Sequence, residues 1–223
     1  MGMHPNCRDN SLCASLDSAS RAKLCAACTR RLVKAGSIQF YNDFETSAVL
    51  VLDGAIMFSA HTGEDVLGLS EELPSFYVGM SGCLLGSNAT FTPDVHHDYE
   101  GNTIEYLSDS CIASIRHYAV RELFRHDEGF AASIARSLVD IMEQACCMSA
   151  LLRARSVYLA VSYLVTYLTA SRIYLTQQQL ADIIARDRAS VSKAIGRIRR
   201  ERPDMWAAYE CNRGRIVELW QPA

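Results

Sequence analysis

Four cysteines near the N-terminus are the residues whose spacing most directly suggests chemistry. Cys7, Cys13, Cys25 and Cys28 follow the pattern C-x5-C-x11-C-x2-C. Four thiolates can hold an iron–sulfur cluster or a tetrahedral zinc ion, and two cysteines separated by two residues chelate one metal well. The same thiols can serve as a disulfide switch or stay unliganded. The spacing therefore indicates a metal or redox site and leaves these alternatives open.

A second group of polar residues lies within 175–200, where two short helices are expected. Thr176 followed three residues later by Gln179 is a capping box, because each side chain can bond the backbone amide of the other residue. Asp187 can cap a second helix. Apolar residues recur at helical spacing behind both caps: Leu180, Ile183 and Ile184, then Val191, Ile195 and Ile198. The pattern predicts a helix-turn-helix.

The outward face of the second predicted helix is basic. It carries long donors and hydroxyls suited to base edges and phosphates in a DNA major groove: Arg188, Ser192, Lys193, Arg197 and Arg200. Segments 207–211 and 216–220 flank the sequence NRGR and predict a β-hairpin with Arg213 and Arg215 at its tip, which would form a wing. The alternative is an amphipathic helix pair with a solvated basic face.

The charge distribution supports a separate C-terminal module. Residues 153–223 contain 12 lysines and arginines against 6 acidic residues, although the whole chain has a net charge of −3. A basic module joined to an acidic remainder is typical of nucleic-acid binding. With 49% hydrophobic and 21% charged residues, the chain should be ordered and globular throughout.

The sequence also indicates a cellular compartment. No apolar run approaches the roughly 18 residues that span a bilayer, and the first residues do not lead into the apolar core of a signal peptide. Nine cysteines in such a chain predict reduced thiols rather than disulfides. We therefore expect a cytoplasmic protein without a membrane partner.

Hydrophobic periodicity divides the rest of the chain. Residues 1–35 are cysteine-rich and resemble an appendage with a short helix at 18–33, whereas 36–118 contain short β-type runs broken by turns, such as 48–52, 55–60 and 76–80. Residues 119–152 predict one long helix. Its apolar residues recur every three or four positions: Phe130, Ile134, Leu138, Ile141, Ala145, Met148 and Leu152. This stripe favours a homodimer through paired helices, and the alternative is a helix lying on the core of its own domain.

At this point the sequence resembles the CRP/FNR superfamily of bacterial transcription regulators over nearly its whole length. Besides the C-terminal module, residues 36–41 (GSIQFY) and 49–59 (VLVLDGAIMFS) resemble the family's β-roll, with a glycine between two consecutive strands. The resemblance implies an α+β fold: a cyclic-nucleotide-binding-like β-roll (jelly roll) at 36–118, a dimerisation helix at 119–152, and a winged helix-turn-helix at 153–223.

The resemblance also implies DNA-contacting residues. Arg188, Ser192 and Lys193 match recognition positions, and Thr176 and Ser190 match phosphate contacts. The set expected to bind DNA is Thr176, Arg188, Ser190, Ser192, Lys193, Arg197, Arg213 and Arg215. Two residues depart from the family pattern: Ala189 stands where many members carry a glutamate, so the usual operator half-site should not be assumed, and Ala185 replaces the common glycine of the turn.

The resemblance also bears on the signal that would control the protein, which is an iron–sulfur cluster in some members of the family and cyclic AMP in others. Oxygen-sensing members carry iron–sulfur ligands near the N-terminus together with one remote cysteine, and Cys111 lies two residues before that remote position, so the candidate ligands are Cys7, Cys13, Cys25, Cys28 and Cys111. Members that bind cyclic AMP use a glutamate and an arginine in the segment matching 82–90, which here has neither. We therefore expect no cyclic AMP response, and a small effector in the β-roll is the alternative to a cluster.

Together these observations indicate a transcription regulator whose partners are double-stranded DNA, a second copy of the chain and, by the resemblance, RNA polymerase. No catalytic triad, phosphate-binding loop or dinucleotide fingerprint is visible, so we expect no enzymatic activity. The main alternative is an iron–sulfur or thiol redox protein without specific DNA binding. A module that binds another protein through the basic helices is a further alternative.

Overall fold

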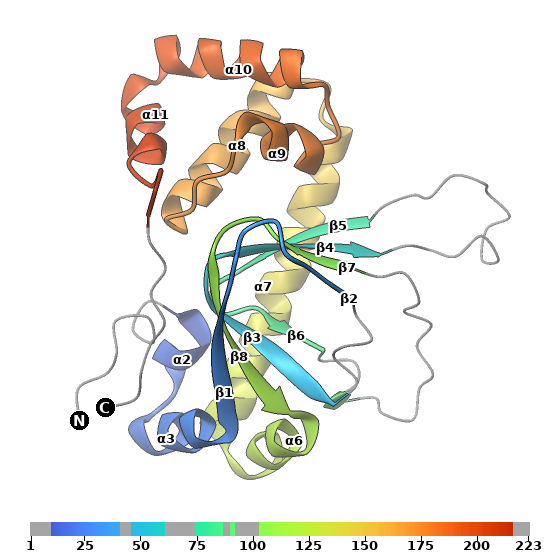
Figure 1. Cartoon of the computed structure of the whole chain (residues 1–223), viewed down its shortest axis with the longest axis vertical. Helices are drawn as coiled ribbons and strands as arrows, with labels where there is room; N and C mark the ends of the chain where they lie inside the picture. The colour runs from blue at the N-terminus through green and yellow to red at the C-terminus, as the bar shows by residue number, and fades with distance from the viewer. Residues whose placement is uncertain (1–9, 41–45, 61–74, 87–89, 92–102, 216–223) are drawn as a thin grey trace, which may run out of the picture. The chain divides into compact units, whose positions relative to one another are not determined.

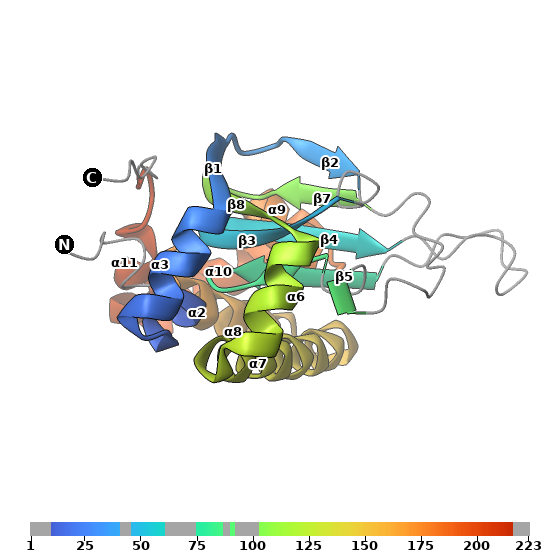
Figure 2. The same ribbon diagram turned by 90° about the horizontal axis from the view of Figure 1, so that it is seen from below.

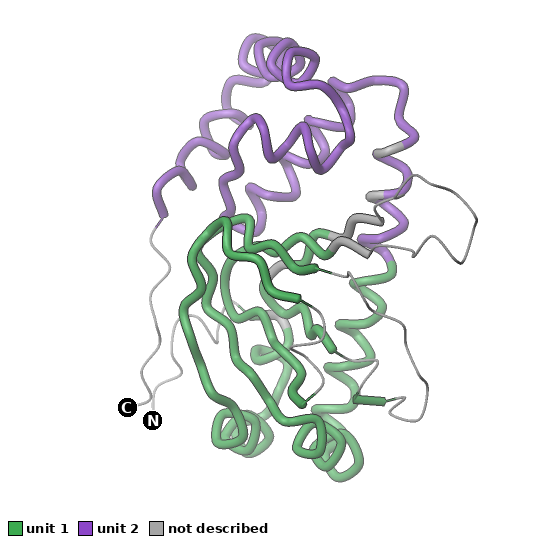
Figure 3. The backbone as a smooth tube through the Cα atoms, turned by 45° about the vertical axis from the view of Figure 1, so that its right-hand side comes forward, with its two compact units in different colours: residues 1–142, 217–223 green, residues 143–216 purple. Residues whose placement is uncertain are grey.

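The computed structural model describes residues 10–40, 46–60, 75–86, 90–91 and 103–215. The chain divides into two compact units, 1–142 with 217–223 and 143–216 (Figure 3). The boundary falls inside one long helix. Among the described residues, no helix has the length and apolar character needed to cross a membrane.

Unit 1 is built on two antiparallel four-stranded sheets, in the orders β1-β8-β3-β6 and β2-β7-β4-β5 (Figure 1). The strands predicted at 48–52, 55–60 and 76–80 are confirmed as β3, β4 and β5. The strands are β1 (Cys28–Val33), β2 (Ile38–Phe40), β3 (Ser47–Asp53), β4 (Ala55–Ala60), β5 (Ser75–Met80), β6 (Leu84–Leu85), β7 (Thr103–Tyr106) and β8 (Ser110–Arg116). This arrangement confirms the β-roll.

The glycine predicted between two consecutive strands is Gly54, which joins β3 to β4 with φ +109°. Residues other than glycine rarely adopt this backbone conformation. A Cβ at position 54 would lie 2.8 Å from Cα and 2.7 Å from Cβ of Ser110. The first residue of β8 therefore fits against the turn only because position 54 has no side chain.

The N-terminal segment is an integral part of unit 1 rather than an appendage. Helices α2 (Ser11–Ser15) and α3 (Ser18–Ala27) lead directly into β1, which pairs with β8, so the predicted helix at 18–33 ends at Ala27. Asn10 caps α2, and its buried amide donates to the carbonyls of Val51 (2.9 Å) and Leu52 (3.4 Å). The sheet domain therefore begins well before residue 36, because α2 and α3 cover its apolar surface.

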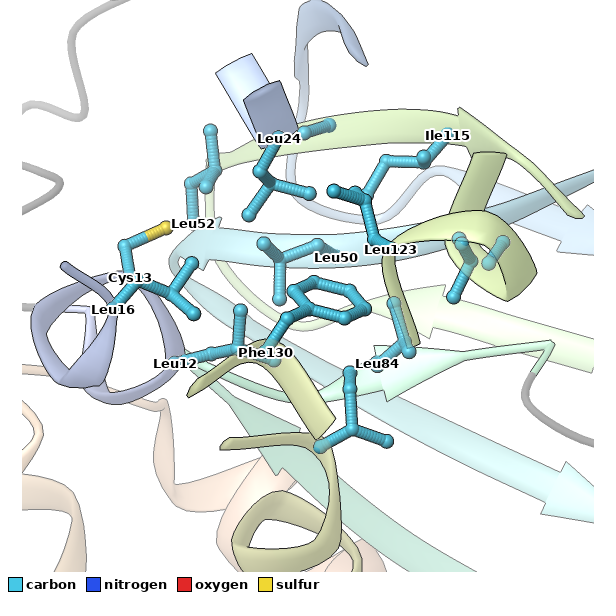
Figure 4. Close-up of a cluster of buried hydrophobic side chains, with 14 of the residues drawn as sticks. Leu12, Cys13, Leu16, Leu24, Leu50, Leu52, Leu84, Ile115, Leu123 and Phe130 are labelled. Carbon is cyan, nitrogen blue, oxygen red and sulfur yellow. The ribbon is translucent and has the colours of Figure 1, made fainter. Parts of the chain in front are cut away.

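One hydrophobic cluster joins these helices to the sheet and to the long helix. Figure 4 shows Phe130 pointing into a group that includes Leu12 from α2, Leu24 from α3 and Leu50 from β3. All four side chains are at most 3% exposed. Because residues of α2, α3 and the long helix share this cluster, the cysteine-bearing segment packs against the first turns of that helix.

The helix predicted at 119–152 is interrupted once. Helix α6 (His117–His126) lies beside α3 (Figure 2), and α7 (Glu128–Arg153) begins after Asp127. Asp127 accepts a hydrogen bond from the backbone N–H of Phe130 (2.9 Å) and another from the Ser20 hydroxyl, and these bonds hold the pKa of its carboxyl below the usual value. The aspartate thus ends one helix, caps the next and ties both to α3.

Helix α7 presents two different apolar faces. Phe130 and Ile134 are buried in the cluster of Figure 4, and Ile141 packs against the second core cluster of the sheets. Leu138, Val139 and Met142 are instead exposed, Met142 to 68%. The predicted stripe is therefore wrong as a single dimer surface, since most of its described side chains pack on the helix's own unit and the exposed face is centred near Met142.

Unit 2 contains the end of α7 and four further helices: α8 (Val157–Ala170), α9 (Gln177–Ile183), α10 (Arg188–Glu201) and α11 (Pro203–Glu210). Its core is mostly aliphatic, with Trp206 and Tyr209 of α11 also buried. Leu164 and Leu168 of α8 are fully buried, as are Ile183, Val191 and Ile198 of the helix pair. The predicted apolar stripes of both short helices are thus confirmed.

Candidate nucleic-acid interface

The helix-turn-helix is confirmed as α9, a turn and α10, and each helix starts at its predicted cap. Thr176 Oγ1 accepts from the N–H of Gln179 (3.2 Å), while Gln179 Oε1 accepts from the N–H of Thr176 (2.9 Å). At α10, Asp187 accepts from the N–H of Ser190 (2.8 Å), and hydrogen bonds from Ser190 lower the pKa of the Asp187 carboxyl. Both starts are therefore fixed by local side-chain chemistry.

The turn between the helices uses a strained residue. Ala185 has φ +48°, a left-handed conformation that costs an alanine about 1 kcal/mol more than a glycine. Hydrogen bonds from the N–H of Ala185 to Asp182 O (3.1 Å) and from the N–H of Arg186 to Ala181 O (3.0 Å) hold the turn in place.

Tyr209 holds the segment that leads into α9. Its hydroxyl donates to the carbonyl of Leu175 and accepts from the N–H of the same residue, both at 2.9 Å. Tyr209 is fully buried, and burial raises the pKa of its hydroxyl. The Tyr209 hydroxyl thus satisfies both backbone polar groups of Leu175. Through this contact, α11 fixes the segment from which the helix-turn-helix starts.

The structure gathers the predicted recognition residues on α10. Arg188, Ser192 and Lys193 are exposed, whereas Ser190 is half-buried under the cap. Thr176 is exposed at the start of α9. Arg200, which sequence reasoning placed on the outward face without including it among the DNA-binding residues, is also exposed; its position seven residues after Lys193 was the signal that could have selected it.

Arg197 lies in a different environment from the other predicted contacts. Its guanidinium donates to Glu201 (2.8 Å) and lies 4.1 Å from the ring centre of Tyr158 on α8. Hydrogen bonds first from Arg197 and then from Tyr158 lower the pKa of the Glu201 carboxyl. Because Nε of Arg197 already donates to Glu201 and its guanidinium stacks on Tyr158, Arg197 is a weaker candidate for phosphate contact than Lys193.

The predicted first strand of the wing is wrong. Residues 207–210 belong to α11, which begins with Pro203 at a helix start and buries Trp206 and Tyr209, three residues apart, on one helical face. Arg213 and Arg215 follow this helix and are exposed. The second predicted strand, 216–220, lies outside the described residues.

The predicted metal ligands are not equally accessible. Cys13 (2% exposed) and Cys111 (0%) lie in the hydrophobic cluster, whereas Cys25 and Cys28 are half-buried at the junction of α3 and β1. Within the described part of the chain, no three Cys, His, Asp or Glu residues come together as a metal site. Cys7 lies outside the described residues. In this conformation the described thiols do not form a ligand set for a cluster, and ligation by them stays a prediction.

Two sheets, a long helix and a capped helix-turn-helix define a protein with a β-roll unit and a helical unit that carries a helix-turn-helix. The sequence matches no protein-family model and no curated protein sequence. Solved structures share the fold at low sequence identity.

Three of them cover most of the chain. A CRP-family transcriptional regulator from Thermus thermophilus aligns with TM-score 0.57 and 16% identity, over 84% of this chain and 98% of its own. The c-di-GMP-responsive regulator CLP of Xanthomonas campestris gives 0.57 and 14%, over 83% and 93%. FixK2 from Bradyrhizobium japonicum gives 0.58 and 11%, over 78% and 85%. The chain has the fold of CRP/FNR proteins, which confirms the fold that the resemblance implied.

Proposed function

We propose that the chain is a homodimeric, sequence-specific DNA-binding transcription regulator of the CRP/FNR type that acts in the cytoplasm together with RNA polymerase and is not an enzyme. The observation that carries the proposal is the exposed basic side of α10, held on a rigid, doubly capped helix-turn-helix. Shared fold with bacterial regulators supports it.

The side chains at the start of α10 suit DNA in both chemistry and position. Arg188 and Lys193 can donate to base edges and phosphates, and the Ser192 hydroxyl can form a hydrogen bond with a base edge or with a phosphate. The exposed methyl group of Ala189 offers only apolar contact, for example with thymine. Without a carboxylate at position 189 to accept from cytosine, we infer an operator half-site different from the one that a glutamate would select.

The exposed face of α7 supports the homodimer. Ala135, Leu138, Met142, Ala145 and Ser149 recur at alternating steps of three and four, and all are exposed. This is the spacing by which parallel helices keep a seam in register. Two copies paired along this face could present two α10 helices to successive major grooves about 34 Å apart.

For the signal, we propose a redox or iron–sulfur input, or a small effector, and not cyclic AMP. Support for an input near the N-terminus comes from packing: Leu12, Leu16 and Leu24 contact the same cluster as Phe130 of α7, and Ser15 Oγ lies 2.7 Å from Ser133 Oγ. A chemical change at the cysteine-bearing segment would therefore alter the packing of α7, the helix of the proposed dimer. The altered packing would shift the population of DNA-binding conformations.

Removing the donors of α10 should abolish tight binding to DNA. In the variant Arg188→Ala with Lys193→Ala, we expect affinity for a duplex selected by the wild-type protein to fall about 100-fold or more, because each contact contributes about 1 to 3 kcal/mol. The slope of log affinity against log salt should become shallower by about 1.8 if both residues contact phosphates. Fluorescence anisotropy at several salt concentrations measures both quantities.

A control for this experiment is Arg125→Ala on α6, which removes an exposed cation from unit 1 and leaves α10 intact. Its affinity and salt slope should equal those of the wild type. A wild-type protein whose binding does not respond to salt, or a double variant that binds as well as the wild type, contradicts the proposed function.

The proposed redox input predicts a cofactor signature. If Cys25 and Cys28 take part in holding a cluster, protein purified without oxygen should be brown and contain iron and sulfide, and Cys28→Ser should lose the colour. Cys211→Ser, at an exposed cysteine after α11, should keep it. A colourless wild-type protein with no iron rejects the cluster and leaves a thiol switch or a small effector as the signal.

A further inference from the structure

Gly196 is an unexpected residue in the middle of α10. Glycine loses more conformational freedom than any other residue when it is fixed in a helix, so an interior glycine destabilises a helix relative to alanine. Gly196 does not belong to the glycines with positive φ in this structure. An alanine could adopt the same backbone conformation, and the conformation therefore does not explain the glycine.

Packing within unit 2 does not explain it either. Among the described residues, the nearest atom to a Cβ built at position 196 is Arg200 Nη1, at 4.0 Å, which is an ordinary contact with the end of a flexible side chain. Gly79 of β5 is a useful contrast, because a Cβ there would lie 3.0 Å from Cys83 Sγ. Gly196 thus leaves free space on the outside of α10 that the domain itself does not fill.

The free space lies between two exposed cations. Lys193 precedes Gly196 by three residues and Arg200 follows it by four, a spacing that puts all three on one side of a helix, opposite the buried Val191 and Ile198. Neither Lys193 nor Arg200 makes a hydrogen bond or ion pair within the described part of the chain. The two long side chains therefore flank a stretch of bare helix backbone.

We propose that Gly196 is the point at which the backbone of α10 comes closest to DNA. The inference rests on the proposed function: a sugar or phosphate of one strand lies against the helix at Gly196, while Lys193 and Arg200 donate to phosphates on either side. A methyl group at position 196 would push the helix away from the duplex and take both cations out of hydrogen-bond distance. Gly196 is thus a positioning residue, retained at a cost in helix stability.

The test is Gly196→Ala, for which two measurements should change in opposite directions. The urea midpoint of unfolding should rise above that of the wild type, because alanine is the better helix former and its Cβ would make only an ordinary contact, with Arg200 Nη1 at 4.0 Å, among the described residues. Affinity for a duplex that the wild-type protein selects from a random library should fall at least tenfold. Gly196→Gln, with a longer side chain, should weaken binding further. A gain in stability together with a loss of affinity cannot come from misfolding.

Gly129→Ala is the matched control, since Gly129 is exposed near the start of α7 and a Cβ there would come no closer than 3.4 Å to Asp127. It should leave affinity unchanged. If Gly196→Ala binds the selected duplex as tightly as the wild type while Lys193→Ala binds weakly, the inference is overturned and the proposed function stands. If the wild-type protein selects no duplex at all, both are overturned.

Discussion

Gly54→Ala should prevent unit 1 from folding stably. An alanine at position 54 would have to adopt a φ of +109°, which is unfavourable for any residue with a Cβ. Its Cβ would also overlap Ser110, which is buried at the start of β8. Backbone strain and overpacking together are expected to lower the free energy of unfolding by about 4 kcal/mol or more, a large share of the roughly 5 to 15 kcal/mol that stabilises a typical domain. Urea denaturation followed by circular dichroism measures the loss.

Gly36→Ala separates the two causes. Gly36 also has a positive φ, +78°, but a Cβ there would meet no atom of the described residues within 4 Å. The free energy of unfolding of this variant should fall only by the cost of backbone strain, about 1 kcal/mol. Equal and small losses for both variants would mean that β8 does not approach the turn at Gly54 as closely as described.

The second large effect is expected at Met142, the most exposed of the large apolar side chains that the structure describes on α7. Met142→Glu would place two carboxylates opposite each other across a symmetric seam, and an uncompensated buried charge costs about 3 to 5 kcal/mol. We expect the proposed dimer to dissociate to a particle near the 24.7 kDa of one chain, with a loss of about 100-fold or more in affinity for the duplex that the wild-type protein selects. Analytical ultracentrifugation and anisotropy measure the two effects.

Arg136→Glu is the corresponding control, because Arg136 is exposed on α7 but lies away from the side that carries Met142. It adds negative charge to the same helix and should leave the mass of the particle and the affinity unchanged. A Met142→Glu protein that sediments with the wild-type mass would mean that the dimer, if it forms, uses another surface.

Features set by local chemistry could be predicted from the sequence. The capping box of Thr176 and Gln179, the cap at Asp187 and the turn signal at Gly54 each act within a few residues, so the helix-turn-helix and the central strands were predicted in the right places. The candidate interface followed from the same signals, because cations at helical spacing opposite a buried stripe must face outward.

Features set by distant contacts could not be predicted. Residues 207–211 contain no strong local signal for helix or strand, and the burial of Trp206 and Tyr209 on one face decided for helix. Residues 28–33 form a strand because they pair with the edge of β8. On α7, apolar residues on adjoining sides merge into one broad pattern, so the sequence does not say that Ile134 faces the sheets while Met142 faces outward.

The amide of Asn10 has a consequence for how the chain unfolds. Since it binds two carbonyls of β3, and Leu12 and Leu24 fill the same core as Leu50, α2 and α3 should open together with the central strands as one cooperative unit. Their amides should exchange with solvent as slowly as those of β3, although a chain terminus usually frays. Any event that detaches the cysteine-bearing segment would then destabilise the whole sheet unit. The fraction of molecules in which this segment is docked and the free energy of unfolding of the unit are therefore thermodynamically linked.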